Sequence, residues 1–216
     1  MALNFANTKG KAQKSTAEAY TYKDGENVVR LVGGILPRYV YWLKGTNNKD
    51  IPVECLAFSR EEEKFTNKED DHVRDYFPDA KCGWAYSCNT LVTVDGVQKV
   101  VVLNLKKKLF EQIITAAEDL GDPTDLDTGW DVVFKRAKTG PLAFNVEYTL
   151  NVLRCKKRSL NEAERDLVTA AIPIDEKIPR ATAAEIKTLL ERITKGADEA
   201  EDDTADGVDK EAVKDL

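Results

Sequence analysis

Apolar and aromatic residues cluster into short runs along the first half of the chain, with glycine, asparagine and aspartate between them. Five such runs are rich in β-branched and aromatic residues: 28–35, 38–43, 51–58, 84–94 and 97–104. This pattern predicts β-strands, and Asp95-Gly96 between the last two runs is a tight-hairpin signal. We therefore expect a β-rich body that begins near Asn27.

A change to helical spacing interrupts the strands after residue 104. Residues 105–120 place apolar side chains three or four positions apart before the turn signal at 121–123, which predicts a helix that ends there. Strand-like runs return at 130–138 and 144–155. The turn residues between these two runs predict a second hairpin after the helix.

Two capping-box spacings mark short helices near the end of the patterned region. Ser159 precedes Glu162 by three positions, and Thr182 precedes Glu185 by three positions. The second pair opens a run whose apolar residues fall on one helical stripe. Two short helices are therefore expected after the second hairpin.

This order of elements favours a mainly β fold with helices, of the α+β class. Five strands with a helix inserted late are typical of an OB-like, partly open barrel. A generic small α+β sheet would give a similar pattern. We prefer the barrel.

Charge and polarity divide the chain into three parts. Residues 196–216 hold nine acids, two lysines and almost nothing apolar, so we expect a disordered acidic tail with a net charge of −7. The whole chain carries −6, which leaves residues 1–195 near +1. Residues 1–26 are polar and lysine-bearing, which predicts a disordered basic arm and one core domain over 27–195. The charged stretch 59–80 is expected to be an insertion within that core.

Several classes of protein are disfavoured by what the sequence lacks. It has no apolar leader and no run near the ~20 apolar residues of a membrane span, which predicts a cytosolic protein without a membrane partner. His72 is the one histidine, and no glycine-rich phosphate loop or nucleophile elbow occurs, so we expect no enzymatic activity. A metal-dependent nuclease using the acids between Glu61 and Asp71 is the weakest alternative, because charge runs in loops are usually solvated.

Zinc is the one cofactor that the residue types suggest. Three thiols and an imidazole, a common ligand set, occur at Cys55, His72, Cys82 and Cys88. Structural zinc modules place paired ligands about two to four residues apart, whereas here 16, 9 and 5 residues separate them. We therefore expect no metal and no other cofactor.

Aromatic residues interleaved with cations are the most informative chemical pattern. An aromatic side chain on a strand can stack on any base, and neighbouring lysines and arginines can follow phosphates without reading sequence. The candidate stacking residues are Tyr39, Tyr41, Trp42, Trp84, Tyr86 and Phe144. The candidate phosphate contacts are Lys44, Lys81, Lys106, Lys107, Lys108, Lys135, Arg136 and Lys138. For each aromatic residue, a place in the barrel core is the competing interpretation.

Two basic clusters need separate comment. Lys106, Lys107 and Lys108 fall at a predicted helix start, where they oppose the helix dipole, so their presence is easier to explain if an anion binds nearby. Arg154 and the basic run 156–158 follow a predicted strand. Solvated side chains are the competing interpretation for this second cluster.

The chain resembles the single-stranded DNA-binding, helix-destabilising proteins of T-even and related bacteriophages. The similar segments occur in the same order: Lys14-Ser15-Thr16 for the basic cooperativity motif, 27–37 for the first barrel strand and turn, 81–94 for the DNA-contacting strand, 106–110 for the start of the inserted helix, 129–140 and 171–173 for later strand and linker patterns, and the acidic carboxyl terminus. Two features depart from that family. The close cysteine pair of its zinc module and the dense basic run beside its cooperativity motif are both absent.

The resemblance implies a sequence-tolerant single-stranded DNA-binding protein of phage DNA replication, recombination and repair, acting in the cytoplasm of the infected bacterium. It also implies a cooperativity arm, in which Lys11, Lys14, Ser15 and Thr16 contact neighbouring copies on DNA. The acidic tail would recruit phage replication and recombination proteins and regulate binding. The alternative from another class is an acidic-tailed replication or recombination adaptor that binds proteins rather than DNA.

Overall fold

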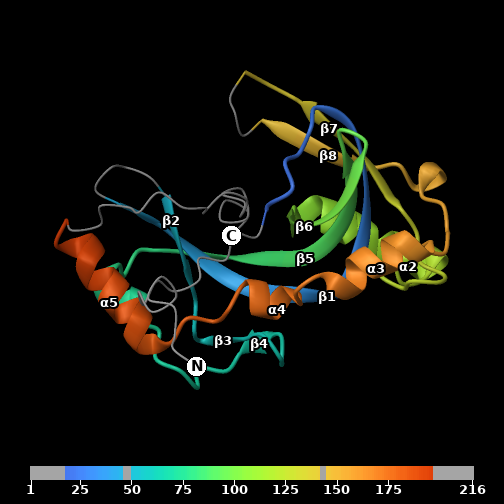
Figure 1. Cartoon of the computed structure of the whole chain (residues 1–216). Coiled ribbons are helices and arrows are strands. Elements are labelled where there is room, and N and C mark those ends of the chain that lie inside the picture. The colour runs from blue at the N-terminus through green and yellow to red at the C-terminus, as the bar shows by residue number, and fades with distance from the viewer. Residues whose placement is uncertain (1–17, 46–49, 142–144, 197–216) are drawn as a thin grey trace, which may run out of the picture.

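The computed structural model describes residues 18–45, 50–141 and 145–196. A six-stranded antiparallel sheet curls into a partly open barrel, and several helices pack against it (Figure 1). The strands of this sheet are β1 (Gly25–Lys44), β2 (Asp50–Glu54), β5 (Cys82–Val94), β6 (Val97–Leu105), β7 (Val132–Lys138) and β8 (Val146–Leu150). The remaining elements are the short hairpin β3 (Phe58–Ser59) and β4 (Lys64–Phe65), the helices α1 (Val73–Tyr76), α2 (Lys107–Leu120), α3 (Glu162–Ala170), α4 (Ile174–Lys177) and α5 (Ala183–Thr194), and the 3₁₀ turn η2 (Val152–Arg154). No helix in the described part of the chain is long and apolar enough to cross a membrane.

The strand order β6-β5-β1-β7-β8, with α2 between β6 and β7 in sequence, confirms the predicted mainly β fold and its OB-like, partly open barrel. β2 adds a sixth strand at the far end of β1. The two strands predicted over 28–43 are one continuous strand, β1, which bends at a bulge between Val32 and Ile35. Gly33 in this bulge has a φ of 73°, a left-handed conformation that glycine adopts without strain.

Residues 18–22, which the sequence places in the basic arm, run along the edge of β6. Tyr20 N donates to the Val102 carbonyl at 2.7 Å, and Val102 N donates to the Glu18 carbonyl at 2.9 Å. These two bonds add a short parallel bridge at Ala19 to the edge of the sheet.

Tyr22 spans the opening of the barrel. Its hydroxyl donates to the Asn104 carbonyl on β6 at 2.7 Å, while its ring centroid lies 5.8 Å from that of Phe134 on β7 and 5.1 Å from that of Tyr148 on β8. Edge-to-face aromatic pairs of this kind contribute about 0.5–1.5 kcal/mol each. One residue therefore links the two strands between which the barrel is open.

Two hydrophobic cores lie on one face of the long β1–β5 pair. The barrel core surrounds Cys88 and Trp130 with residues of α2, and the second core surrounds Tyr41 and Cys55 with residues of α5. Directly opposed residues of two strands share a face, and so do alternate residues of one strand. The opposed pairs that lead from the barrel core to the second core are Ile35↔Cys88, Pro37↔Tyr86, Tyr39↔Trp84 and Tyr41↔Cys82. In Figure 1 the elements around the two cores lie at opposite ends of β1 and β5, with β7 and β8 at one end and β2 and α5 at the other.

The observed helix caps agree with the sequence prediction at α5 and differ from it at α3. Thr182 and Glu185 form the expected capping box at the start of α5. The box predicted at Ser159 is wrong, because Asn161 caps α3 and exchanges hydrogen bonds with Glu164 instead. Leu160 is buried between β1 and α3, and the helix begins only after this residue.

Candidate nucleic-acid interface

Six aromatic side chains, which we call the aromatic band, cover the sheet face between the two cores: Tyr39, Phe58, Phe65, Trp84, Tyr86 and Phe110. On the barrel side, the ring centroid of Tyr86 lies 4.4 Å from that of Trp84 and 4.6 Å from that of Phe110. On the other side, the ring centroid of Tyr39 lies 4.7 Å from that of Phe58 and 4.8 Å from that of Phe65. The opposed pair Tyr39↔Trp84 joins the two groups.

The band has a buried backing and an accessible surface. Phe58 and Phe110 are buried, whereas Phe65 is 45% exposed. Tyr39, Trp84 and Tyr86 are half-buried. Trp84 therefore packs against the barrel core, as the core interpretation predicts, and also keeps accessible surface, as the stacking interpretation requires.

The tyrosines of the band remain uncharged. Burial, followed by the nearby charges, raises the pKa of Tyr39. Burial and the hydrogen bond that its hydroxyl donates to Glu63 raise the pKa of Tyr86. Neutral phenol rings suit stacking, but the Glu63 carboxylate places a negative charge at the border of the band.

The start of α2 gives the barrel side of the band a positive border. Lys106 is the N-cap residue, its side chain forms no cap, and the first turn contains no acid. The helix dipole and the free backbone N–H groups therefore add to the charges of Lys107 and Lys108. Phe110 belongs to the same turn and contacts Trp84 and Tyr86, so the lysines are adjacent to the aromatic surface. This is a suitable arrangement for binding an anion.

Lys106 is held differently from its two neighbours. Its ammonium nitrogen lies 5.6 Å from the ring centroid of Tyr22 and 6.0 Å from that of Tyr148. These cation–π contacts tie the start of α2 to the segment that spans the barrel opening.

The other predicted cations differ in how far they are already neutralised. Lys44 is paired with Asp50 at 2.6 Å, and Arg136 is paired with Asp24. Lys81 is exposed just before β5, and Lys135 and Lys138 are exposed on β7.

Two of the predicted aromatic residues that the structure describes do not join the band. Tyr41 is fully buried and donates a hydrogen bond to Asp71 at 2.6 Å, so it belongs to the second core and offers no surface to a base. Trp42 projects from the opposite face of β1, because side chains alternate along a strand. Phe144 lies outside the described residues, as do the arm residues Lys11, Lys14, Ser15 and Thr16.

The band also contains three residues that the sequence analysis missed. Phe58 and Phe65 belong to the β3–β4 hairpin, within or beside a stretch whose charge concealed them. Phe110 follows the three lysines by two positions, and this spacing was the available signal. The sequence could not show that a short hairpin folds back against Tyr39.

The four residues considered for zinc do not converge. Cys88 is buried in the barrel core, where burial raises its thiol pKa to about 12, and His72 contacts Asp75 at 3.2 Å. Among the described residues, no group of three or more His, Cys, Asp or Glu side chains could hold a metal ion.

Cys55 and Cys82 do meet, in the second core. A hydrogen bond between their thiols lowers the pKa of Cys82 to about 7 and raises that of Cys55, whose thiol also contacts Asp71 at 3.3 Å. Cys82 lies on β5 two positions before Trp84 and is half-buried, so the more acidic thiol borders the aromatic band.

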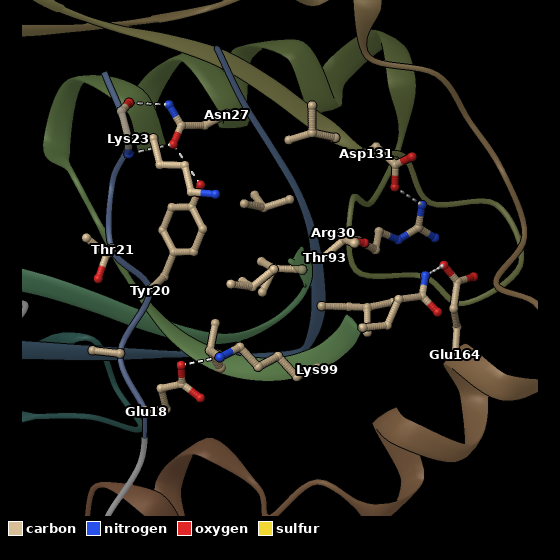
Figure 2. A pocket seen from close by; sticks show the side chains of 18 of the residues that line it. Glu18, Tyr20, Thr21, Lys23, Asn27, Arg30, Thr93, Lys99, Asp131 and Glu164 are labelled. Carbon is tan, nitrogen blue, oxygen red and sulfur yellow. Dashed lines mark hydrogen bonds and ion pairs between the residues drawn. The ribbon is translucent and has the colours of Figure 1, made fainter. Parts of the chain in front are cut away.

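A cavity of about 340 Å³ lies at the other end of the barrel, between residues 18–23 and the strands β1, β5 and β6 (Figure 2). Its charged residues are largely paired with one another, Lys99 with Glu18, Arg30 with Asp131, and Arg158 with Glu164. Tyr20 closes one side through a hydrogen bond from its hydroxyl to Asn27 at 2.7 Å. With its charges balanced, this cavity is less suited to a polyanion than the start of α2.

One known protein shares part of this sequence. A probable ssDNA-binding protein of Escherichia phage T5 is 37% identical to the chain over 75 residues. The match covers 35% of this chain and 29% of the phage protein, so the chain spans less than a third of that relative's length. No protein-family model and no solved structure matches the chain.

Proposed function

We propose that this protein binds single-stranded DNA without sequence preference and performs no covalent chemistry. The observation that carries the proposal is the aromatic band with three lysines at one border. The partial similarity to the probable ssDNA-binding protein of phage T5 supports the same ligand. Base stacking on aromatic side chains is worth about 1–3 kcal/mol per base, and every base has a face that can stack.

The strand would lie across the band with its bases on Tyr39, Trp84, Tyr86 and Phe65. Its phosphates would follow Lys107 and Lys108 at the start of α2, and Lys81 would contact the backbone beyond Trp84. Lys138 would extend the positive path on the barrel-core face of β7, whereas Lys135 projects from the opposite face, because side chains alternate along a strand. None of these contacts distinguishes one base from another, so the binding tolerates any sequence.

The wider biological setting belongs to the proposal as well. The protein would coat single strands during phage DNA replication, recombination and repair in the cytoplasm of the infected bacterium, as the resemblance to T-even phage proteins implies. Residues 1–17 would contact neighbouring copies on DNA, with Lys11, Lys14, Ser15 and Thr16 in that arm. The three parts would then be the arm, the DNA-binding core and the acidic tail.

A titration of the full-length protein with oligo-dT at several salt concentrations tests the proposal. We expect a stoichiometric complex without cleavage, and log K should fall with log salt by about 0.7 per phosphate neutralised. An affinity that does not depend on salt would contradict the phosphate contacts. Absence of any complex would favour the adaptor alternative, and magnesium-dependent cutting would favour the nuclease alternative.

The acidic tail is proposed to compete with DNA for the basic border and to recruit replication and recombination proteins. Residues 196–216 carry nine carboxylates on a short tether, so their effective concentration near the core is high. Removing them should strengthen binding to single strands and to duplex at low salt, and the gain should shrink as salt screens the charges. If the truncated protein binds both DNAs as the intact protein does, the tail serves protein partners alone.

A further inference from the structure

Lys106 is held between two tyrosine rings at the opening of the barrel. Its ammonium nitrogen lies 5.6 Å from the ring centroid of Tyr22 and 6.0 Å from that of Tyr148. Lys106 is the N-cap of α2, and its carbonyl accepts a hydrogen bond from the Phe110 N–H at 2.8 Å. Phe110 is a residue of the aromatic band. The held ammonium therefore belongs to the first turn of the helix that borders the band.

Tyr22 is anchored to the part of the chain that leads into α2. Its hydroxyl donates to the carbonyl of Asn104, which stands two positions before Lys106. Its ring centroid lies 5.1 Å from that of the second tyrosine against the ammonium. The backbone that precedes it is fixed as well, because the Tyr20 N–H donates to the Val102 carbonyl at 2.7 Å. Ring, hydroxyl and backbone together fix Tyr22 relative to the start of α2.

This way of holding a cation differs from an ion pair. Lys44 and Arg136 are held by the carboxylates of Asp50 and Asp24, which cancel their charges. A tyrosine ring attracts an ammonium through its quadrupole and carries no net charge. The two ring contacts therefore restrict the long Lys106 side chain and leave its charge for a phosphate. Because a lysine side chain loses rotamer freedom when it binds, restricting it beforehand reduces the cost of binding.

We propose that Tyr22 is a positioning residue of the DNA-binding surface, which holds the Lys106 ammonium where it binds a phosphate of the single strand. Lys106 then joins Lys107 and Lys108 as the third phosphate contact at the start of α2. This role rests on the proposed binding of single-stranded DNA. Linkage makes the effect reciprocal, so DNA bound to Lys106 stabilises the docking of residues 18–22 by the same factor. Occupancy of the surface is thereby passed to the segment that directly follows the proposed arm.

A double-mutant cycle with oligo-dT separates positioning from packing. Tyr22→Leu keeps an apolar side chain and removes the ring. It should weaken oligo-dT binding about two- to tenfold at low salt, because a lysine side chain that is no longer held must be immobilised by the DNA. Tyr22→Phe keeps the ring and should bind as the intact protein does. In Lys106→Met, which has no ammonium, adding Y22L should cause no further loss.

Hydrogen exchange measures the reciprocal effect without changing Tyr22. The Tyr20 and Val102 N–H groups make the two bonds that dock residues 18–22 on β6, so their exchange reports undocking. Saturating oligo-dT should slow the exchange of both amides about two- to tenfold in the intact protein, since linkage requires the same factor. In K106M, saturating oligo-dT should leave these two exchange rates unchanged.

Tyr76→Leu is the matched control, because Tyr76 is also a half-buried tyrosine but packs against the second core. It should change neither the affinity for oligo-dT nor the exchange of the two amides. Thermal melting shows whether Y22L folds. If it does not fold, the exchange rates of the intact protein and of K106M decide between the outcomes.

Several results would overturn the positioning role of Tyr22. Equal losses from Y22L in the intact and K106M backgrounds would place its action away from Lys106, and a loss with Y22F as large as with Y22L would assign the effect to the hydroxyl. Unchanged or higher affinity with Y22L, unchanged affinity with K106M, or equal slowing of the two amides by DNA in K106M would also overturn it. If the intact protein binds no oligo-dT, the proposed function itself fails.

Discussion

The two borders of the aromatic band carry opposite charges. At the barrel border, α2 begins with three lysines and has no acid in its first turn. At the other border, residues 59–80 contain the acidic runs 61–63 and 69–71. A bound polyanion is therefore attracted to one border and repelled at the other. In the proposed complex, this difference would place the bases on the band and the phosphates on the α2 side.

The acids of the second border are not equivalent. Glu62 is bound by Lys64 and by Lys68, each at 2.7 Å, and these contacts, Lys64 first, lower its pKa to about 2. Glu63 is bound by the neutral hydroxyl of Tyr86 instead. Its charge therefore lacks the cationic neighbours that Glu62 has, although it is the acid that touches the band.

Removing the positive border should have the largest effect. Replacing Lys106, Lys107 and Lys108 with alanine should weaken oligo-dT binding on the order of a hundredfold at low salt and reduce the salt slope by roughly 2. The same change removes cations from a helix start, which favours stability, but it also removes the cation–π contacts of Lys106, worth about 0.5–1 kcal/mol each, so thermal stability should change little. Titration and thermal melting measure the two properties separately. Lys187→Ala, an exposed lysine on α5, is the control and should change neither. A triple variant that binds normally would refute the assignment of phosphates to α2.

The sequence predicted the positive border better than the aromatic surface. Three adjacent lysines at a helix start are a local pattern, and the helix starts within one residue of them. Which aromatic residues share a face depends on the register of β1 against β5 and on a bulge at Gly33, and neither is encoded by neighbouring residues. Tyr41 shares the face of Tyr39, but the second core buries it, and Phe58 and Phe110 reach the band only through tertiary packing. Trp42 could have been set apart from Tyr39 by strand alternation alone.

The stacking surface should contribute the next largest effect. Trp84→Ala should weaken oligo-dT binding by about 1–3 kcal/mol, because a stacked base loses its platform. Trp42→Ala is a close control, since Trp42 is also half-buried on a strand of the same sheet but projects from the opposite face. Quenching of intrinsic fluorescence by DNA should disappear with W84A and persist with W42A. Circular dichroism checks the fold, and an unfolded W84A protein would assign Trp84 to the core alone.

The reactivity of two cysteines on β5 distinguishes the band from the barrel core, because Cys82 borders the band and Cys88 lies in the core. The lower pKa of Cys82, about 7, means that its reactive thiolate forms as pH rises from 6 to 8, whereas the pKa of Cys88, about 12, keeps that thiol protonated. Iodoacetamide should therefore label Cys82 at least about tenfold faster than Cys88 at pH 7. Saturating oligo-dT should slow Cys82 labelling severalfold by covering the band. Mass spectrometry of the labelled peptides would show both effects, and equal labelling rates with and without DNA would place the strand away from Cys82.

The smallest effect is expected at the negative border, and it tests whether repulsion there orients the strand. Glu63→Gln keeps an oxygen that can accept the Tyr86 hydrogen bond and removes the charge. Two charges about 4 Å apart interact by about 1 kcal/mol in water, and salt reduces this, so binding should strengthen by roughly two- to threefold at low salt and by less at high salt.

Glu62→Gln is unsuitable as a control, because it removes a negative charge and also releases Lys64 and Lys68 from their ion pairs. Glu61→Gln, exposed in the same loop, is therefore the control and should give a smaller gain. Equal gains from E61Q and E63Q would mean that only the total charge of residues 59–80 matters, and a loss of affinity with E63Q would mean that the carboxylate is needed to hold Tyr86 in its stacking position.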